Sequence, residues 1–440
     1  MKTNIGPSLS NTRKRWKRGT RGTRGTIGTR GTRGTRGTRG TRGTIGKRGA
    51  RGARLTRTAG KKGPVNSKKI RHNSIFRRTQ KLNKNYKLKL DIKQPLFIDQ
   101  KLVSNMKMIS RPNDSGSNSY VYLIHNDKGE GHVLKLTITT NDELKESGNY
   151  PLTEVKIYKV MNSLVKGFVT PHTFTIMDSL SVEREKFQSE LKGMVPEGNG
   201  VVAILTETSM KKDTIMTLYD LLEQHSPSEN ILLNIIFQVL YTLEAFNMIN
   251  LKHNDLHMGN IFIIKYNEIK QNVYHQYTLA DKTKVFLPNL GYSVRIFDYD
   301  RSCKQPADPP FEKQILPAYD DFVSIGQTCD INANFDTYKF LYHLISDSKM
   351  PDSIKQIIKQ FFRTDSTLIT DGTIANGDVY NIPDDTGRRW GMLRGTVSGK
   401  DEMKSTHDML KTLATNFEPL PLGGELEAKY SLRYIKNIKQ

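Results

Sequence analysis

The stretch K-H-N-D-L-H-M-G-N-I-F-I-I, residues 252–264, shapes the interpretation of the whole chain. It carries His253, an aspartate two residues later (Asp255), and an asparagine five residues after that (Asn260). The carboxylate of Asp255 could accept a proton from a hydroxyl group, and the amide oxygen of Asn260 could bind a cation. The apolar run Ile261 to Ile264 predicts a short buried strand, which would hold this polar loop in place.

A second apolar strand that ends in a carboxylate follows further along the chain. It is V-R-I-F-D-Y-D-R-S, residues 294–302, and its apolar part ends at Asp298. A loop aspartate, a loop asparagine and a strand-end aspartate in this order are typical of a site for magnesium and phosphate. A solvated loop–strand–loop could contain the same residue types, but their ordered spacing favours the site.

Charge is distributed unevenly along the 440 residues, a length that predicts two or three domains. Residues 1–90 hold 29 of the 68 Lys and Arg and no Asp or Glu. The other 350 residues therefore carry 39 basic and 44 acidic groups, a net charge of −5. The sequence thus predicts a polycationic arm on a nearly neutral body, and the arm implies an anionic partner.

The arm is dominated by a tandem Arg-Gly-Thr repeat over residues 19–54, with glycine at every third position from Gly19 to Gly52. Its low apolar content predicts disorder, and residues 13–89 are expected to bind nucleic acid or an acidic surface. Two alternatives are a collagen-like triple helix, which the absence of proline in the repeat disfavours, and a solvated tail that binds nothing. The basic linker extends to residue 93, and a folded domain is expected over residues 94–440.

The first part of that domain is predicted to be rich in β-structure. A hairpin is predicted, with strands at Val121 to Ile124 and His132 to Thr137. The loop ahead of it holds Gly116, where a glycine-rich phosphate loop would lie. Lys135 is placed inside an apolar strand, where an ammonium group needs a partner. Glu154, in a segment with helical spacing, is the candidate partner.

Further elements follow in chain order. Residues 201–208 predict a buried strand that ends near Glu207 and Thr208, preceded by an inserted loop at 178–199. Residues 231–248 predict a long apolar helix, and residues 334–345 predict a buried helix with Asp336 near its start. Asp336 could either support the polar loop from below or interact with the helix dipole. Little is predicted for the last 75 residues.

Cysteine content and hydropathy bear on the compartment. The two cysteines, Cys303 and Cys329, lack metal-type spacing, which suits a reducing compartment and disfavours a disulfide framework. The apolar runs fall short of the ~18 residues that span a membrane, and the N-terminus lacks a signal-peptide core. A soluble, intracellular protein without a membrane span is therefore expected.

The chain resembles the eukaryotic protein-kinase superfamily over about residues 106–362. The resemblance is strongest to the divergent haspin-type branch and to the serine/threonine kinases of large DNA viruses, through D-L-H-M-G-N, I-F-D-Y-D and F-D-T-Y. It rests on eight residues in matching order: Lys135, Glu154, Glu207, His253, Asp255, Asn260, Asp298 and Asp336. It implies an α+β, bilobal fold, with a β-rich N-lobe at about 100–208 and a larger helical C-lobe at about 209–440. A viral source, with a location in the virion or in the cytoplasm or nucleus of a host, would follow from resemblance alone.

The resemblance also implies roles for particular residues. Asp255 would be the catalytic base and His257 would lie near the γ-phosphate of ATP, in the position where most kinases have lysine. Asn260 and Asp298 would bind Mg²⁺. The remaining ATP contacts would come from Lys135, Glu154, Gly116, Val121, Glu207 and Thr208. Asn254 stands where an arginine usually reads activation-loop phosphate, Tyr299 and Asp300 replace Phe and Gly, and an A-P-E motif is missing.

The resemblance implies ATP-dependent transfer of a phosphoryl group to serine or threonine hydroxyls of a protein substrate. A small-molecule kinase of the aminoglycoside or choline type is an alternative, because H-x-D-L-H-x-G-N matches residues 253–260 equally well. A pseudokinase scaffold, tethered to nucleic acid by the arm, is a second alternative that the eroded glycine loop would support.

Overall fold

The computed structural model describes residues 105–110, 119–125, 131–145, 150–183, 195–209, 214–316, 329, 334–362, 369–370, 373–374, 382–383, 389–390 and 403–438. Contacts divide the chain into Met1–Ser67 and Lys68–Gln440, and every described residue belongs to the second unit. The basic arm, the domain start at residue 94 and Gly116 lie outside the described residues. What was expected of them therefore stays a prediction.

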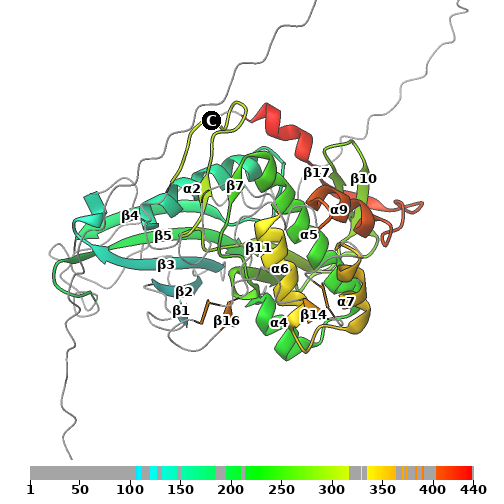
Figure 1. Cartoon of the computed structure of the whole chain (residues 1–440), viewed down its shortest axis with the longest axis horizontal. Coiled ribbons are helices and arrows are strands. Elements are labelled where there is room, and N and C mark those ends of the chain that lie inside the picture. Colours follow the sequence, from blue (N-terminus) through cyan, green and yellow to red (C-terminus); the bar gives the residue numbers. More distant parts are fainter. Residues whose placement is uncertain are drawn as a thin grey trace, which may run out of the picture. The chain divides into compact units, whose positions relative to one another are not determined.

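A five-stranded antiparallel sheet forms the first part of the described region (Figure 1). In spatial order its strands are β1 (Asn105–Ser110), β2 (Ser119–His125), β3 (Gly131–Thr140), β5 (Asn199–Ser209) and β4 (Thr175–Glu183). The predicted hairpin is β2–β3, in which Val121 lies opposite Lys135. A loop was predicted over residues 178–199. This prediction is wrong for residues 178–183, which form the end of β4 and pair with β5.

Helix α2 (Tyr150–Lys166) lies along β4 and β5, as Figure 1 shows. It was expected from the spacing of Val155, Tyr158 and Met161, and all three side chains are buried. Burial of each such side chain contributes about 1.5–3 kcal/mol, which fixes the helix against the sheet. The same packing holds Glu154, which is completely buried, on the inner side of α2.

Helices dominate the second part of the fold. They are α4 (Leu218–His225), α5 (Glu229–Met248), α6 (Phe335–Ser346), α7 (Asp352–Lys359) and α9 (Thr406–Ala414). The described residues also form the short 3-10 helices η3 (Glu143–Lys145), η5 (Met258–Asn260) and η7 (Leu432–Asn437). Helix α4 begins with a capping box, in which Thr217 and Asp220 each bond the other's backbone N–H. The described architecture is therefore α+β, with its sheet-rich part first in the sequence.

Helix α5 is the central core helix of this part and contacts α6, α7 and α9. It is long and apolar enough to cross a membrane, so the expectation that no apolar run reaches that length was wrong. However, 78% of its most apolar 18-residue stretch is buried inside the fold. Such burial is typical of the core helix of a globular fold, and it is consistent with a soluble protein.

Small sheets position the polar loop at residues 253–260. Strand β8 (Ile261–Lys265) lies between β6 (Thr214–Thr217) and β11 (Tyr292–Ile296), and all three are antiparallel. Ile261 pairs with Ile296, so the chain enters β8 and leaves β11 at the same end of this sheet. A two-stranded pair, β7 (Leu251–Lys252) with β12 (Cys303–Lys304), joins the segments on the other side of the loop.

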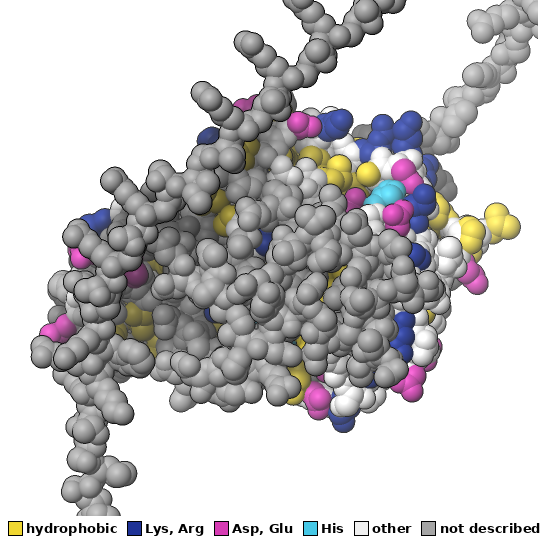
Figure 2. Space-filling model, viewed as in Figure 1, with side chains coloured by type: hydrophobic (Ala, Val, Ile, Leu, Met, Phe, Trp, Pro, Cys, Tyr) yellow, Lys and Arg dark blue, Asp and Glu magenta, His cyan; other side chains and the backbone are white. Residues whose placement is uncertain are grey.

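The insertion expected at residues 265–292 is ordered as a hairpin of β9 (Val273–Thr278) and β10 (Lys284–Pro288). Strand β17 (Glu425–Ser431) pairs with β9 in parallel. Short two-residue strands make two further pairs: β13 (Ile369–Thr370) with β14 (Thr373–Ile374), and β15 (Ile382–Pro383) with β16 (Arg389–Trp390). On the face in Figure 2, acidic and basic side chains of the described residues are interspersed, as the near-neutral body predicts.

Candidate active site

The loop between β7 and β8 is supported by the first turn of α6. One oxygen of the Asp336 carboxylate accepts a hydrogen bond from His253 N at 2.6 Å, and the other accepts one from Asn254 N at 2.9 Å. Asn254 is in the left-handed region, with φ of 66°, where asparagine is better tolerated than most residues. Two roles were considered for Asp336, and the structure shows the one in which its carboxylate supports the loop.

Three further contacts bring Asp255, the loop asparagine and the strand-end aspartate together. Asn260 donates from Nδ2 to the backbone oxygen of Asp255 at 2.9 Å, so its amide oxygen is the atom that could bind a cation. The residue before Asp298 is attached to the loop twice: Phe297 N donates to Asn260 O at 3.0 Å, and Phe297 O lies 2.9 Å from His253 Nε2. The predicted trio of Asp255, Asn260 and Asp298 is thus held at one place.

Lys135 reaches this place from the sheet. Its side chain is 2% exposed, and its ammonium group forms an ion pair with Asp298. It also lies 2.9 Å from Glu154 Oε2 and 3.8 Å from Asp300 Oδ2. The structure therefore gives Lys135 the helix partner expected from the sequence, and it adds two carboxylates from the segment after β11.

The balance of charge in this cluster is acidic, with three carboxylates around one ammonium group. Burial raises the pKa of Glu154, an effect that the neighbouring Lys135 only partly offsets. Burial and the adjacent Asp298 likewise raise the pKa of Asp300. Burial alone would lower the pKa of Lys135, but the three carboxylates outweigh it and raise that pKa. Lys135 is therefore charged at neutral pH.

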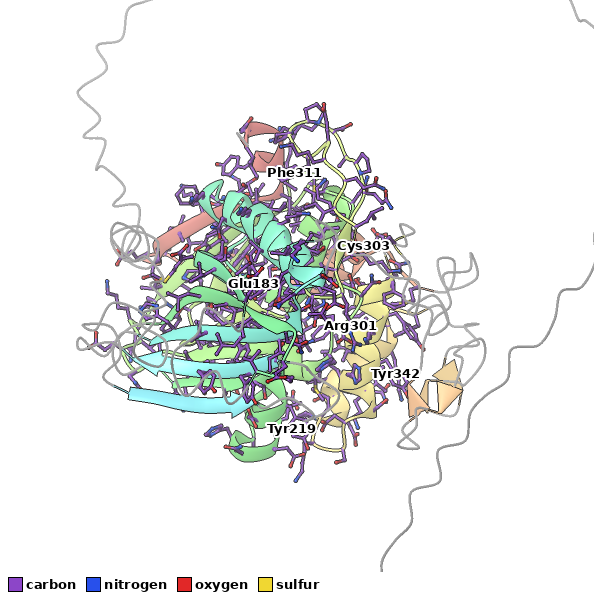
Figure 3. The ribbon with its side chains drawn as sticks, turned by 90° about the vertical axis from the view of Figure 1, so that its left-hand side faces the viewer. Glu183, Tyr219, Arg301, Cys303, Phe311 and Tyr342 are labelled. Carbon is purple, nitrogen blue, oxygen red and sulfur yellow. A yellow bond between two sulfur atoms is a disulfide. The ribbon has the colours of Figure 1, made fainter. Side chains whose placement is uncertain are left out.

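Asp255 has the opposite surroundings. Its Oδ1 lies 2.7 Å from Lys339 Nζ and its Oδ2 lies 3.4 Å from Arg301 Nη1. Burial would raise the pKa of Asp255, but the cations Lys339 and Arg301 lower it well below its usual range. In Figure 3 Arg301 lies between the end of the five-stranded sheet and α6. Asp255 is therefore ionised at neutral pH.

His257 lies at the start of η5, and its Nδ1 accepts a hydrogen bond from Gly259 N at 3.1 Å. Its ring centre is 6.1 Å from that of His343 on α6. Burial lowers the pKa of both rings, and Lys339 lowers them further; that of His343 falls to about 3. Both imidazoles are therefore neutral at physiological pH, so His257 does not supply the positive charge of a lysine.

The remaining predicted nucleotide contacts are only partly described. Val121 is buried opposite Lys135, and its contact with a nucleotide stays a prediction. Glu207 and Thr208 lie near the end of β5, but their side chains are outside the described part of the structure, as is all of Gly116. The cofactor contacts assigned to these three residues stay predictions.

Three charged residues beside the site were not predicted from the sequence: Lys339, Arg301 and Asp300. Lys339 stands three residues after Asp336 in an apolar helix, so a lysine on the buried side was a signal that could have been used. Asp300 and Arg301 directly follow Asp298, but which way they face depends on a turn that sequence spacing does not define.

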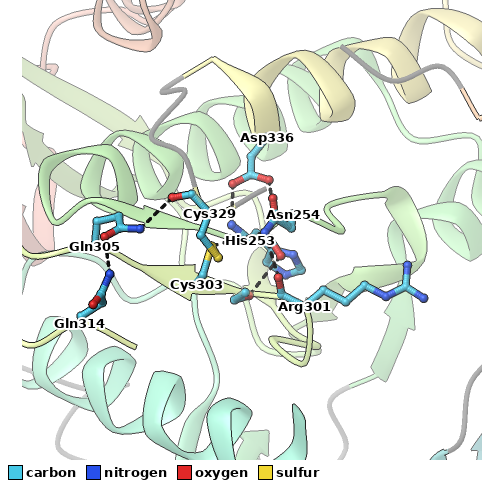
Figure 4. The surroundings of a disulfide bond; sticks show 9 residues. His253, Asn254, Arg301, Cys303, Gln305, Gln314, Cys329 and Asp336 are labelled. Carbon is cyan, nitrogen blue, oxygen red and sulfur yellow. Dashed lines mark hydrogen bonds between the residues drawn. A yellow bond between two sulfur atoms is a disulfide. The ribbon is translucent and has the colours of Figure 1, made fainter. Parts of the chain in front are cut away.

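A disulfide lies beside the loop, contrary to the expectation that Cys303 and Cys329 would stay reduced. Their Cα atoms are 5.7 Å apart, which suits a disulfide. Asn254 donates from Nδ2 to Arg301 O at 3.0 Å and to Cys303 Sγ at 3.5 Å (Figure 4). Asn254, which stands where an arginine was expected to be missing, therefore connects the loop to the segment after Asp298.

The residues present fit magnesium better than a metal held by protein alone. In the described residues no group of three or more His, Cys, Asp or Glu is arranged to hold a metal ion. Magnesium in phosphoryl-transfer enzymes is bound by one or two carboxylates together with substrate phosphates. Asp298 and the amide oxygen of Asn260 supply oxygen ligands of this kind, beside an acidic cluster that would favour a cation.

Comparisons with known proteins add little to this geometry. No protein-family model matches the chain, and no curated protein matches it. Among solved structures it is similar to one titled "WaaP in complex with acyl carrier protein", with 10% identity and a TM-score of 0.31 over 57% of this chain and 76% of that one. At these values the two chains differ too much for the activity of one to indicate that of the other.

Proposed function

We propose that this chain is an ATP-dependent phosphotransferase that acts on serine or threonine hydroxyls of a protein. One observation carries the proposal: the acid-rich Lys135 cluster and the ionised Asp255 belong to one site, joined through the loop and the end of β11. Catalysis of phosphoryl transfer requires mainly positioning and neutralisation of phosphate charge, and these two groups supply both.

The residues of the chain would act as follows. Lys135 binds phosphate oxygens of ATP, and Glu154 keeps its ammonium group in place. Asp298 and Asn260 would hold Mg²⁺, which would neutralise charge on the phosphates. Asp255 accepts a hydrogen bond from the acceptor hydroxyl and orients its oxygen towards the γ-phosphorus. The new O–P bond forms as the bond to the β–γ bridging oxygen breaks, ADP leaves, and the hydroxyl proton passes to Asp255.

Asp255 suits an orienting role better than that of a strong base. Its lowered pKa means that it would take the proton only late in the reaction, when the hydroxyl oxygen already carries the phosphoryl group. Transfer through a loose transition state does not require early proton removal. Support for a protein acceptor comes from the F-D-T-Y segment, whose aspartate, Asp336, supports the loop.

The test is transfer from γ-labelled ATP by the full chain with Mg²⁺. Acceptors are protamine and casein as basic and acidic proteins, with kanamycin and choline as small hydroxylated amines. We expect labelled phosphoserine or phosphothreonine in a protein and none in the amines. Label only in an amine would support the small-molecule alternative, and binding of Mg·ATP without transfer to any acceptor would support a pseudokinase. Binding of nucleic acid or an acidic surface by residues 13–89 stays a separate prediction.

A further inference from the structure

Helix α6 presents three polar side chains to the catalytic loop, at positions 336, 339 and 343. Asp336 accepts hydrogen bonds from two backbone N–H groups of the loop, as described above. One turn later, Lys339 Nζ donates to Asn254 O at 3.2 Å and to Asp255 Oδ1 at 2.7 Å. Since i and i+3 lie on the same side of a helix, one rigid element holds both the backbone of the loop and its carboxylate.

The two cations beside Asp255 differ in how firmly they are held. The Lys339 side chain is 6% exposed and comes from a packed helix, whereas that of Arg301 is 31% exposed and comes from a turn. A buried ammonium group is costly unless it is paired, so Lys339 has little alternative to its present partners. Lys339 therefore fixes Oδ1 of Asp255. Arg301 makes a longer contact with Oδ2 of Asp255, and a substrate hydroxyl could replace that contact more easily.

We propose that Lys339 is the positioning residue for Asp255: it anchors Oδ1 so that Oδ2 is presented to the acceptor hydroxyl. This inference rests on the proposed phosphotransfer. His257, on the loop itself, is neutral and cannot provide this charge. The positive charge is thus delivered from α6, below the loop. Misplacement of a reacting group by about 1 Å costs about 10²-fold in rate, which sets the size of the expected effect.

The experiment measures kcat and KM for ATP in full-length Lys339→Met, Lys339→Arg and Asp255→Asn, and in the double variant Lys339→Met/Asp255→Asn. The acceptor is the protein labelled best by the wild type. Lys349→Met, the same substitution at an exposed lysine of the following turn, is the matched control. Unfolding curves for every variant separate loss of structure from loss of rate.

We expect Lys339→Met to lower kcat about 10²-fold with KM for ATP nearly unchanged, and Lys339→Arg to recover part of the rate. Lys349→Met should match the wild type. The double variant should be no slower than Asp255→Asn alone, because a residue that acts through Asp255 has nothing left to position. A purely structural role would instead add its loss to that of Asp255→Asn.

Any of four results would overturn the inference. An active wild type whose kcat is unchanged by Lys339→Met, or additive losses in the double variant, would reject Lys339 and leave the proposed function intact. A folded wild type that transfers no phosphate would reject both. If Lys339→Met does not fold, the Lys339→Arg variant provides the test. Arginine keeps the positive charge but places its donor groups differently, so a wild-type kcat would show that the exact position of the charge does not affect the rate.

Discussion

Two neighbouring clusters in this molecule have opposite charge balance, and both contain a buried lysine. Around Lys135 there are three carboxylates, those of Glu154, Asp298 and Asp300. Around Asp255 there are two cations, Lys339 and Arg301. The first lysine comes from the sheet and the second from α6, so each part of the fold contributes one.

The difference separates two tasks that phosphoryl transfer requires. Burial raises the pKa of Glu154 and of Asp300, and the neighbouring Asp298 raises both further. The acidic cluster holds more negative charge than its lysine neutralises, and this favours a further cation. The basic cluster keeps Asp255 ionised and oriented. We infer that the acidic cluster binds Mg²⁺ with the nucleotide and that the basic cluster orients the acceptor.

The largest effect is expected when the acidic cluster loses its metal ligand. Asp298→Asn should lower phosphoryl transfer about 10³-fold, or about 4 kcal/mol, because the charge that holds Mg²⁺ is gone. Titration calorimetry of ATP with and without Mg²⁺ should show that the metal no longer strengthens binding. If ATP binding still depends on Mg²⁺ as in the wild type, the metal is held elsewhere.

The next effect concerns stability and compares the two lysines directly. Lys135→Met should lower the free energy of unfolding by about 3 kcal/mol, because it leaves buried carboxylates without their cation. Lys339→Met should cost less, since Asp255 keeps Arg301 and is 15% exposed. Urea denaturation at neutral pH measures both. The reverse order would mean that the acidic cluster does not depend on Lys135.

A smaller effect tests whether the histidines beside the basic cluster are neutral. The pKa of His343 is about 3 in the fold, below its ordinary value of 6.5. As pH falls below 6.5, the unfolded chain binds a proton that the folded chain does not, so stability falls. Between about pH 7.5 and about pH 5.5 this amounts to about 1.4 kcal/mol, which His343→Gln should remove. An unchanged pH dependence of unfolding in His343→Gln would show that the pKa of His343 is the same in the folded and unfolded chains.

The smallest effect is expected for the third member of the acidic cluster. Because burial raises the pKa of Glu154, a neutral glutamine resembles the form that burial favours. Glu154→Gln should therefore change the free energy of unfolding by less than about 1 kcal/mol, far less than Lys135→Met. Equal losses for the two variants in the same denaturation experiment would mean that Glu154 is fully ionised in the fold.

Much of the site follows from sequence because it depends on local patterns. Asn260 directly precedes one short apolar strand, Asp298 follows another, and the structure pairs those strands as β8 and β11. Asp255 lies in the loop that leads to the first of them. Lys135 and Glu154 are polar residues in apolar elements, which points to a partner for each. Assignment of their catalytic roles still depends on the experiments above.

Other features have no local signal. The parallel pairing of β17 with β9 joins segments about 150 residues apart in the sequence, and nothing in either segment specifies the other. The Cys303–Cys329 disulfide depends on a chain path that a separation of 26 residues does not define. Arg301 and Asp300 acquire their contacts from the turn after Asp298, whose own φ of 67° could not be foreseen.

The most direct test of the proposed function is to measure Mg·ATP affinity and phosphoryl transfer together in Asp255→Asn. The account predicts that the affinity stays within about twofold of the wild type, because the acidic cluster is intact. It predicts that transfer falls about 10³-fold, because the acceptor hydroxyl is no longer oriented. Wild-type turnover in Asp255→Asn would contradict the assignment of this site.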